Sequence, residues 1–393
     1  MKLIPTDLRS DVELRIDSIK RHMKHLGMDA VLVATSTNIF YTSTRVFKGY
    51  VYIPKDENPL WFLIKPDIFE EEDDVIKIRK PENIPAELKK LGREMPRTVG
   101  YEFDDLSYSD VERLKAVYPE AEACNGSQVL RRARMVKTPV ELAKMKEDGV
   151  HQAEAYRRIT RCYKENMTDL EFQIEIEKIL RLEGCLGYVR TSGNLMDINL
   201  GSVIAGDNAD NPSPFDYTMG GAGVDPSLPG GANGTSIKPG ETVMVDMNGS
   251  FNGYQTDMTR VWRLGEIPEL ARFAHKCSID ILRECEKIGV PGTPVADLYK
   301  KAMEIVESEK LSDYFMGHRQ KAAFIGHGVG IELNEQPVVT PRSKDHLEEN
   351  MTIALEPKFV IPGVGAVGVE NTYVVTPEGL KSITIFPEEI QEL

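Results

Sequence analysis

The chain has 393 residues, of which 41% are hydrophobic and 28% charged, a composition typical of globular proteins rather than disordered ones. Its formal net charge of −14 argues against a nucleic-acid binder, because phosphate contacts need clustered Lys and Arg. No apolar run approaches the length of a membrane span, and the first residues lack the apolar segment of a signal peptide. We therefore expect a cytoplasmic protein with neither nucleic acid nor a membrane as partner.

The first third of the chain mixes helical and strand patterns. The sequence SDVE at Ser10–Glu13 predicts a capping box that opens an amphipathic helix, which ends near Gly27. DAVLVAT reads as a buried strand, and WFLIKP and TVGYEF predict further strands. We interpret residues 1–130 as a mixed α/β domain and residues 131–393 as a second domain, with the junction between Asn125 and Lys137.

Three further helix starts follow in the second domain. TPVE from Thr138 and TDLE from Thr168 both have the capping-box pattern, and the second of these helices should stop near Gly184. Thr293 with Pro294 begins another helix. Residues 187–240 are rich in Gly, Pro, Asn and Asp and form either the rim of an active site or a mobile lid, of which we favour the rim. Five cysteines show no CxxC pairing, so we expect buried free thiols in a reducing compartment.

Two predicted β-hairpins each carry a pair of acidic residues. The first, VMVDMNGSFNGYQTDMTRVW, contains Asp246 and Asp257, which face each other if the tip lies near residues 251–252. The second, MTIALEPKFVIPGVGAVGVENTYVV, contains Glu356 and Glu370, which face each other if the turn is centred on Gly363. Flanking apolar residues such as Ile353, Leu355 and Phe359 predict burial, so several of these carboxylates should be at least partly buried.

Buried like charges are costly unless they are protonated or paired. His327, in FIGHGVG between the two hairpins, adds an imidazole to the four carboxylates. This ligand set suits manganese, iron, cobalt or zinc, and four negative charges balance two divalent cations. The sequence therefore predicts a site for two metal ions, with manganese as the first choice.

The order Asp246, Asp257, His327, Glu356, Glu370 resembles the metal ligands of the pita-bread metallopeptidases, which include Xaa-Pro dipeptidase, Xaa-Pro aminopeptidase and methionine aminopeptidase. The words KPGETVMVDMNG, GYQTDMTR, GHGVG, LEPK and VENTYVVTPEG carry the resemblance over the last two-thirds of the chain. The first third is similar to the amino-terminal domain of the prolidase and creatinase branch.

The resemblance implies an α/β fold in which a creatinase-like domain precedes a pita-bread domain with a curved, mainly antiparallel sheet flanked by helices. It also implies a homodimer. Our hypothesis makes Asp257 and Glu370 bridging ligands, with Asp246 on one metal and His327 and Glu356 on the other. The family suggests that Glu356 also accepts a proton from the attacking water.

Three positions depart from the prolidase pattern. Where prolidases carry a histidine before the first ligand, this chain has SLPGGANG, and a second family histidine is replaced by Asn334. The arginine that prolidases place two residues before the last glutamate is Gly368. Loss of the imidazoles removes proton donors, and loss of the arginine removes a clamp for a carboxylate.

The polar residues left to bind substrate are few. Our candidates are Asn334, Tyr254, Asp216 and Asn233, with Tyr217 and Glu335 beside them, and we interpret Arg260 as a structural cation. Three functions remain open: an Xaa-Pro peptidase acting on a short peptide, a relative acting on a small amide- or amidine-like metabolite, and a catalytically silent binding protein stabilised by metal. The intact set of five ligands favours an enzyme.

Overall fold

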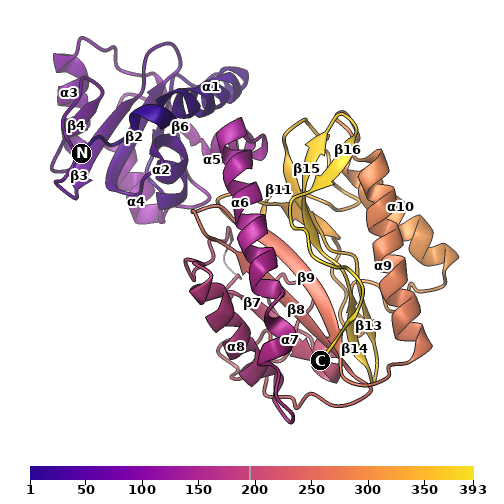
Figure 1. The fold of residues 1–393 in the computed structure, drawn as a ribbon. Helices are drawn as coiled ribbons and strands as arrows, with labels where there is room; N and C mark the ends of the chain where they lie inside the picture. The colour runs from indigo at the N-terminus through magenta and orange to yellow at the C-terminus, as the bar shows by residue number, and fades with distance from the viewer. Residues whose placement is uncertain (194–195) are drawn as a thin grey trace. The chain divides into compact units, whose positions relative to one another are not determined.

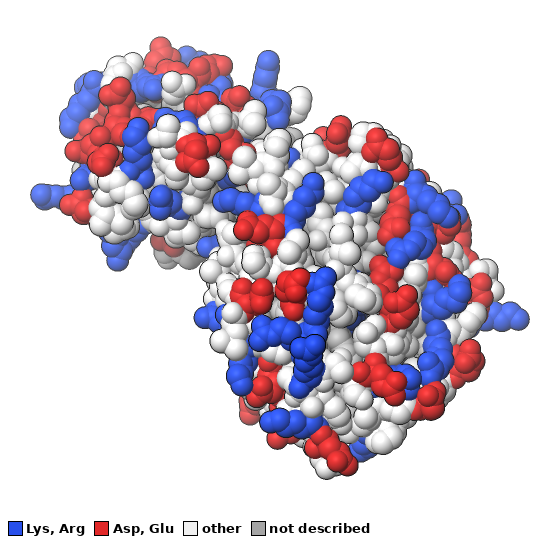
Figure 2. Space-filling model, in the orientation of Figure 1, with Lys and Arg blue, Asp and Glu red and all other residues white. Residues whose placement is uncertain are grey.

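The computed structural model describes residues 1–193 and 196–393, and the chain divides into two compact units, Met1–Arg134 and Met135–Leu393 (Figure 1). All five cysteines are free, as predicted, but only Cys185, Cys277 and Cys285 are buried, whereas Cys124 and Cys162 are partly exposed. None of the helices in the described residues combines the length and apolar character needed to cross a membrane. Figure 2 shows acidic and basic side chains interspersed over the visible face of each unit.

The first unit is built on a six-stranded mixed sheet in the order β4-β3-β2-β1-β5-β6. Its central strand β1 pairs antiparallel with β2 and parallel with β5, and its faces bury a core that includes Leu32, Phe62 and Val99. The strands are β1 (Ala30–Val33), β2 (Lys48–Pro54), β3 (Leu60–Lys65), β4 (Val75–Lys77), β5 (Thr98–Tyr101) and β6 (Glu122–Asn125). The helices are η1 (Thr6–Leu8), α1 (Arg9–Leu26), α2 (Ser36–Ser43), η2 (Pro81–Asn83), α3 (Ile84–Lys90), α4 (Tyr108–Lys115) and α5 (Ser127–Met135).

The start of α1 differs from the sequence prediction. The helix ends as expected at Gly27, whose φ of 68° is the left-handed conformation that glycine adopts without strain. It begins at Arg9, however, directly after the 3-10 turn η1, so Ser10 lies inside its first turn and is not a cap. The predicted capping box is therefore wrong, because the chain enters the helix from a turn that is already helical. The three predicted strands are confirmed as β1, β3 and β5.

The second unit contains two larger sheets, β17-β9-β8-β7 and β11-β10-β12-β15-β16, and the hairpin β13-β14. Helices α6 and α8 lie on one side of these strands, and α9 and α10 on the other (Figure 1). The helices are α6 (Pro139–Tyr156), α7 (Ile159–Cys162), α8 (Asp169–Leu182), η3 (Gly206–Asp210), α9 (Glu269–Ile288) and α10 (Val295–Ser308). The strands are β7 (Gly201–Ala205), β8 (Thr242–Gly249), β9 (Thr256–Arg263), β10 (Gly326–Gly328), β11 (Glu335–Val338), β12 (Thr352–Leu355), β13 (Lys358–Ile361), β14 (Gly365–Gly368), β15 (Asn371–Thr376), β16 (Gly379–Ser382) and β17 (Gln391–Glu392).

Local sequence explains where these helices start. Thr138 and Thr168 each accept a hydrogen bond from the backbone three residues later, and each forms the predicted capping box at the start of α6 and α8. Helix α10 starts at Val295, directly after Pro294. The sequence analysis did not predict α9, the longest helix of the second unit, although its buried residues recur every three or four positions.

The side chains of β8 alternate between the hydrophobic core on one face of the strand and the acidic cluster on the other. Val243, Val245 and Met247 are fully buried in the apolar cluster that the strand shares with α6 and α8. Successive side chains of a strand point to opposite faces, so Asp246 and Asn248 face the other way. The acidic residue is thus held on a rigid strand whose opposite face is anchored in the core.

Candidate metal centre

The five predicted ligands come from five separate strands or strand ends of the second unit. Asp246 lies on β8, Asp257 on β9 and His327 on β10. Glu356 lies between β12 and β13, and Glu370 lies between β14 and β15. Ligand atoms of Asp257, His327 and Glu370 lie within 4.8 Å of one another, and so do those of Asp246, Glu356 and Glu370. Glu370 is common to both groups.

The register of the first hairpin differs from the prediction. Asp246 pairs with Thr259 and Asp257 pairs with Asn248, because the tip lies one residue further along the chain than expected. The two aspartates are therefore diagonal neighbours rather than direct partners. Since they are separated by an even number of pairs, they still share one face of the sheet.

The second hairpin has the predicted register, with a break in its ladder at the acidic residues. Leu355 pairs with Asn371 on one side of the break, and Lys358 pairs with Gly368 on the other, as a turn centred on Gly363 requires. Pro357 has no backbone N–H to donate across the gap.

A serine from α9 fills this break. The Ser278 hydroxyl donates to the Pro357 carbonyl oxygen at 2.5 Å and accepts from the Val369 backbone N–H at 2.9 Å. The interruption therefore leaves the backbone satisfied. It also frees Glu356 and Glu370 from the ladder, so that both side chains can turn toward the site.

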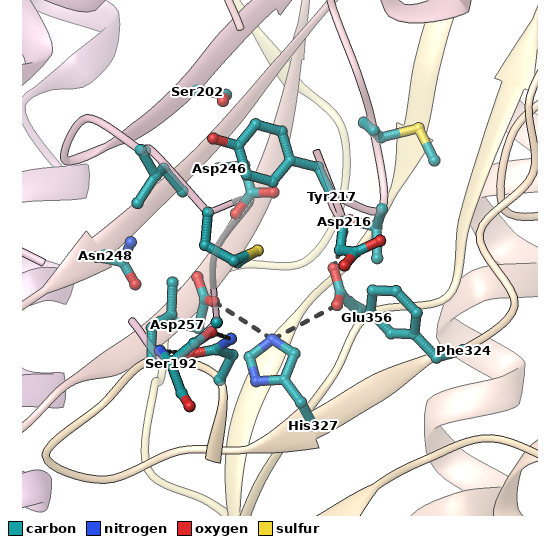
Figure 3. Close-up of a pocket in the computed structure, with 18 of the residues that line it drawn as sticks. Ser192, Ser202, Asp216, Tyr217, Asp246, Asn248, Asp257, Phe324, His327 and Glu356 are labelled. Carbon is teal, nitrogen blue, oxygen red and sulfur yellow. Dashed lines mark hydrogen bonds and ion pairs between the residues drawn. The ribbon is translucent and has the colours of Figure 1, made fainter. Parts of the chain in front are cut away.

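His327 faces the carboxylates (Figure 3). Its Nε2 atom lies 3.6 Å from Glu356 Oε1 and 3.9 Å from Asp257 Oδ2. These separations are too long for hydrogen bonds, and they are suited to ligands arranged around a common centre. The imidazole is thus placed beside the group formed with Asp257 and Glu370.

Lys358 places an ammonium group among the carboxylates of Asp246, Glu356 and Glu370. Its Nζ atom donates to Glu356 Oε2 at 2.7 Å, Asp246 Oδ2 at 2.8 Å and Glu370 Oε2 at 3.0 Å, and its side chain is fully buried. Sequence analysis missed this role. The available signal was the place of Lys358 two residues after Glu356, a spacing that puts both side chains on one face of a continuous strand.

Burial sets the charge behaviour of the site. It raises the pKa of both Asp257 and Glu370 well above the ordinary range, and the neighbouring carboxylates add to the effect. Burial alone would lower the pKa of Lys358, but the carboxylates of Asp246, Glu356 and Glu370 outweigh it and hold that pKa well above the usual value. The carboxylates of the site therefore need nearby positive charge to be stable in their ionised form. The Lys358 ammonium supplies one such charge.

The group of Asp257, His327 and Glu370 fits a divalent cation. Glu370 Oε1 is buried and has no hydrogen-bond partner in the described part of the chain, whereas Glu370 Oε2 accepts from Lys358 and from the Thr259 hydroxyl. Carboxylate oxygen and imidazole nitrogen are ligands that manganese, iron, cobalt and zinc all accept. The group of Asp246, Glu356 and Glu370 is different, since the Lys358 ammonium occupies it.

A cavity of about 350 Å³ opens beside these ligands. Asp246, Asp257, His327 and Glu356 line it, together with residues of the Gly-rich 187–240 segment (Figure 3). That segment thus contributes to the wall of the cavity. The cavity also has an apolar wall formed by Met196, Ile198, Met219, Phe324, Leu333 and Val338.

Two of the four substrate-binding candidates lie at the cavity. Asp216 lines it, and so does Asn334, whose side-chain amide donates to the Ser192 carbonyl oxygen and accepts from its backbone N–H, each at 2.7 Å. Asn334 therefore stabilises the part of the cavity wall that contains Ser192. Tyr217 also lines it.

Tyr254 and Asn233 are not among the described residues that line the cavity. Tyr254 is fully buried and donates from its hydroxyl to Glu141 at 3.1 Å. Asn233 accepts hydrogen bonds from the backbone and hydroxyl of Thr235 in a local turn. We therefore do not carry these two residues forward as substrate contacts.

The sequence analysis missed Asn248 and Thr218. Asn248 lines the cavity, and its buried side-chain oxygen has no hydrogen-bond partner among the described residues. Its place two residues after Asp246 on β8 was the available signal. The Thr218 hydroxyl donates to Glu356 Oε2 at 2.6 Å and accepts from Lys358 Nζ at 3.2 Å.

Arg260 connects the two hairpins. Its guanidinium donates to the carbonyl oxygens of Thr259 and Glu370 at 2.8 and 2.7 Å, and to Asn371 Oδ1 at 2.8 Å. It also donates to the carbonyl oxygens of Pro387 and Phe386, each at 2.9 Å. These contacts fix the backbone that carries Glu370 rather than its carboxylate.

Comparison with known proteins defines the class. The model of metallopeptidase family M24 matches residues 143–377, and the Creatinase/Prolidase N-terminal domain matches residues 15–136. The chain belongs to metallopeptidase family M24, and it is a metallopeptidase-like hydrolase with a creatinase-like first domain and a pita-bread second domain.

Particular relatives extend over nearly the whole chain. It is 26% identical to the Xaa-Pro dipeptidase of Pyrococcus furiosus, with 96% of this chain and 99% of the relative covered. It is also 26% identical to the Xaa-Pro dipeptidase of Lactobacillus delbrueckii subsp. lactis, with 97% and 99% covered. The fold matches an Xaa-Pro dipeptidase structure from Bacillus anthracis with a TM-score of 0.79 at 22% identity, covering 97% of this chain and 100% of the other. An X-Pro aminopeptidase structure from Thermotoga maritima matches with a TM-score of 0.77 at 20% identity, covering 95% and 100%.

Proposed function

We propose that this protein hydrolyses an amide bond of a short Xaa-Pro-type peptide with the help of a divalent cation. The observation that carries the proposal is the convergence of Asp257, His327 and Glu370 on one buried group at the wall of a cavity large enough for a small peptide. The relatives from Pyrococcus furiosus and Lactobacillus delbrueckii are both named Xaa-Pro dipeptidases, which supports the same substrate class.

In this proposal Asp257, His327 and Glu370 hold the cation. When bound there, a divalent cation lowers the pKa of a water molecule and polarises a carbonyl oxygen. Glu356 is the proton acceptor. Its Oε2 atom is fixed by Lys358 and Thr218, while Oε1 lies on the His327 side, so the carboxylate is held in one orientation at the cavity.

The charge of the cavity favours a substrate with a free amino terminus. Asp216, Asp246, Asp257 and Glu356 line it, whereas none of its described lining residues is Lys or Arg. An ammonium group of the substrate is thus stabilised by the acids, but the free carboxylate of a dipeptide has no cationic side chain to pair with. We propose that the preferred substrates carry their proline amide-linked or esterified rather than as a free acid.

A panel of peptides tests this proposal. We expect turnover of Xaa-Pro-amides and Xaa-Pro-Xaa tripeptides at higher kcat/KM than the matching Xaa-Pro dipeptides, and loss of turnover after N-acetylation. Chelation should abolish activity and manganese should restore it. His327→Ala should remove activity, while His346→Ala, at an exposed residue of the same unit, should leave it intact.

Absence of turnover across the whole panel by metal-loaded protein would contradict the peptidase proposal. It would favour instead the small amide-like metabolite, a class that the missing cationic clamp also accommodates. The homodimer stays a prediction from the family resemblance, and sedimentation velocity at micromolar concentration tests it.

A further inference from the structure

The ligands form two groups, and the chain itself fills one of them. The group of Asp246, Glu356 and Glu370 offers one carboxylate oxygen from each residue. Lys358 Nζ lies 2.7 to 3.0 Å from these three carboxylates. An ammonium group has three N–H donors, and the three carboxylate oxygens are its nearest acceptors, with the Thr218 hydroxyl further away at 3.2 Å.

The position of Lys358 is fixed by the strand that carries it. It is the first residue of β13, it pairs with Gly368 of β14, and its side chain is among the largest that are fully buried. Ser278 holds the neighbouring Pro357, and the Lys358 carbonyl oxygen accepts from the Met316 backbone N–H at 2.8 Å. The ammonium therefore cannot swing into solvent without opening the hairpin.

Gly368 makes room for the lysine. A Cβ atom at Gly368 would meet the Pro357 carbonyl oxygen at 2.7 Å, Lys358 Cα at 2.8 Å and Lys358 Cγ at 3.1 Å. The φ of Gly368, +145°, also disfavours any residue with a side chain. Gly368 is the position at which the resemblance places the prolidase arginine. The same glycine therefore leaves the site without an arginine to bind a substrate carboxylate and leaves space for the side chain of Lys358.

A metal ion at the second group would need the oxygens that already bind the ammonium. It would also lie next to a fixed positive charge, and like charges at such a distance repel strongly where water is excluded. By contrast, no hydrogen bond or ion pair joins the Lys358 ammonium to Asp257 or His327 among the described residues, and Glu370 Oε1 has no hydrogen-bond partner there.

We infer that the Lys358 ammonium replaces one of two metal ions, so that the centre takes a single divalent cation, held by Asp257, His327 and Glu370. This inference rests on the proposed function for the use of a metal. It deepens that proposal, because four carboxylates with one ammonium and one dication leave one negative charge, which suits a substrate bearing an amino terminus.

Metal stoichiometry tests the inference without reference to activity. The full chain is stripped with chelator and titrated with Mn²⁺ alone by calorimetry, and its metal content is measured after desalting. We expect one equivalent for the wild type and two for Lys358→Ala, which removes both the charge and the bulk. Lys381→Ala, at an exposed lysine of the same unit, is the matched control and should bind one.

The outcomes separate the inference from the proposed function. Two equivalents bound by the wild type would overturn the inference and leave metal-dependent hydrolysis intact. A folded Lys358→Ala protein that still binds only one would also overturn it, because the lysine would then not be what excludes the second ion. If that variant fails to fold, the wild-type stoichiometry still decides between one ion and two. No binding by the wild type would overturn the proposed function itself.

Discussion

The two acidic hairpins of the second unit solve the same electrostatic problem in different ways. The first, β8-β9, is an unbroken ladder, and its two arginines, Arg260 and Arg263, bond to groups other than the carboxylates of Asp246 and Asp257 among the described residues. The second, β12–β15, is interrupted at Glu356 and Glu370 and contributes Lys358 to the same cluster. The comparison teaches that a break in a ladder can bring a strand-borne cation to a site where the fully paired hairpin contributes carboxylates but no cation bonded to them.

The largest expected effect is the loss of that cation. Lys358→Met keeps the side-chain length but leaves the buried Glu356 and Glu370 and the partly buried Asp246 without their partner, so in chelator we expect it to lower the free energy of unfolding by about 3–5 kcal/mol. Urea denaturation measures this change, and Lys381→Met should stay within about 0.5 kcal/mol of the wild type. A loss below about 1 kcal/mol would show that the second hairpin does not depend on its own cation.

The next effect concerns the close packing of the second hairpin. Gly368→Ala combines an unfavourable φ with contacts below 3 Å, and we expect a loss of about 3 kcal/mol. Gly363→Ala is the matched control, because Gly363 also has a positive φ, of +76°, but open space around its Cβ position. It should cost about 1 kcal/mol. Equal losses for the two variants in urea denaturation would contradict the packing argument.

A smaller effect tests whether the first hairpin supports the second. Arg260→Lys keeps the charge but cannot reach all five acceptors, so we expect a loss of about 2 kcal/mol in thermal or urea unfolding. The partly exposed Arg272→Lys should change stability by less than about 0.5 kcal/mol. An unchanged stability for Arg260→Lys would mean that the two hairpins are held together without the guanidinium.

The last effect builds up gradually with pH and concerns α6, which packs on the first hairpin. Burial raises the pKa of Asp148 to about 8, whereas the carboxyl of an unfolded chain has a pKa of about 3.9. Between these values the folded protein binds a proton that the unfolded chain has released. The free energy of unfolding therefore falls as pH rises, by about 1.4 kcal/mol per pH unit.

Asp148→Asn should remove this slope, so its stability gain over the wild type should grow between pH 5 and pH 7.5 in urea denaturation. Asp313→Asn, at an exposed aspartate, is the control. Parallel stability curves for Asp148→Asn and the wild type would show that this carboxyl does not retain its proton in the folded protein.

Turn chemistry explains how far the sequence predicted this arrangement. The compact turn at Gly363 fixed the register of the second hairpin, whereas the longer tip of the first, between Gly249 and Thr256, left its register one residue in error. Capping boxes located α6 and α8, but Pro268 gives no side-chain cap to α9, which was not predicted. Helix starts and tight turns are local signals, and a wide loop offers none.

The same limit applies to the site. Pairing of two adjacent strands in a hairpin was enough to place Asp246 and Asp257 on one face, but the contacts of Lys358 join β8, β13 and the 187–240 segment through Thr218. Asn334 bonds to Ser192 and Tyr254 bonds to Glu141 instead of being free to bind substrate. Each of these hydrogen bonds likewise joins residues more than 100 positions apart in the sequence. Such pairings depend on tertiary packing rather than on spacing in the sequence.

The most direct test of the account is anomalous X-ray diffraction from crystals of the wild-type protein grown in excess Mn²⁺. We predict one manganese peak per chain, bounded by Asp257, His327 and Glu370, with the Lys358 side chain ordered among Asp246, Glu356 and Glu370. Two peaks, with Lys358 turned away from the carboxylates, would contradict it.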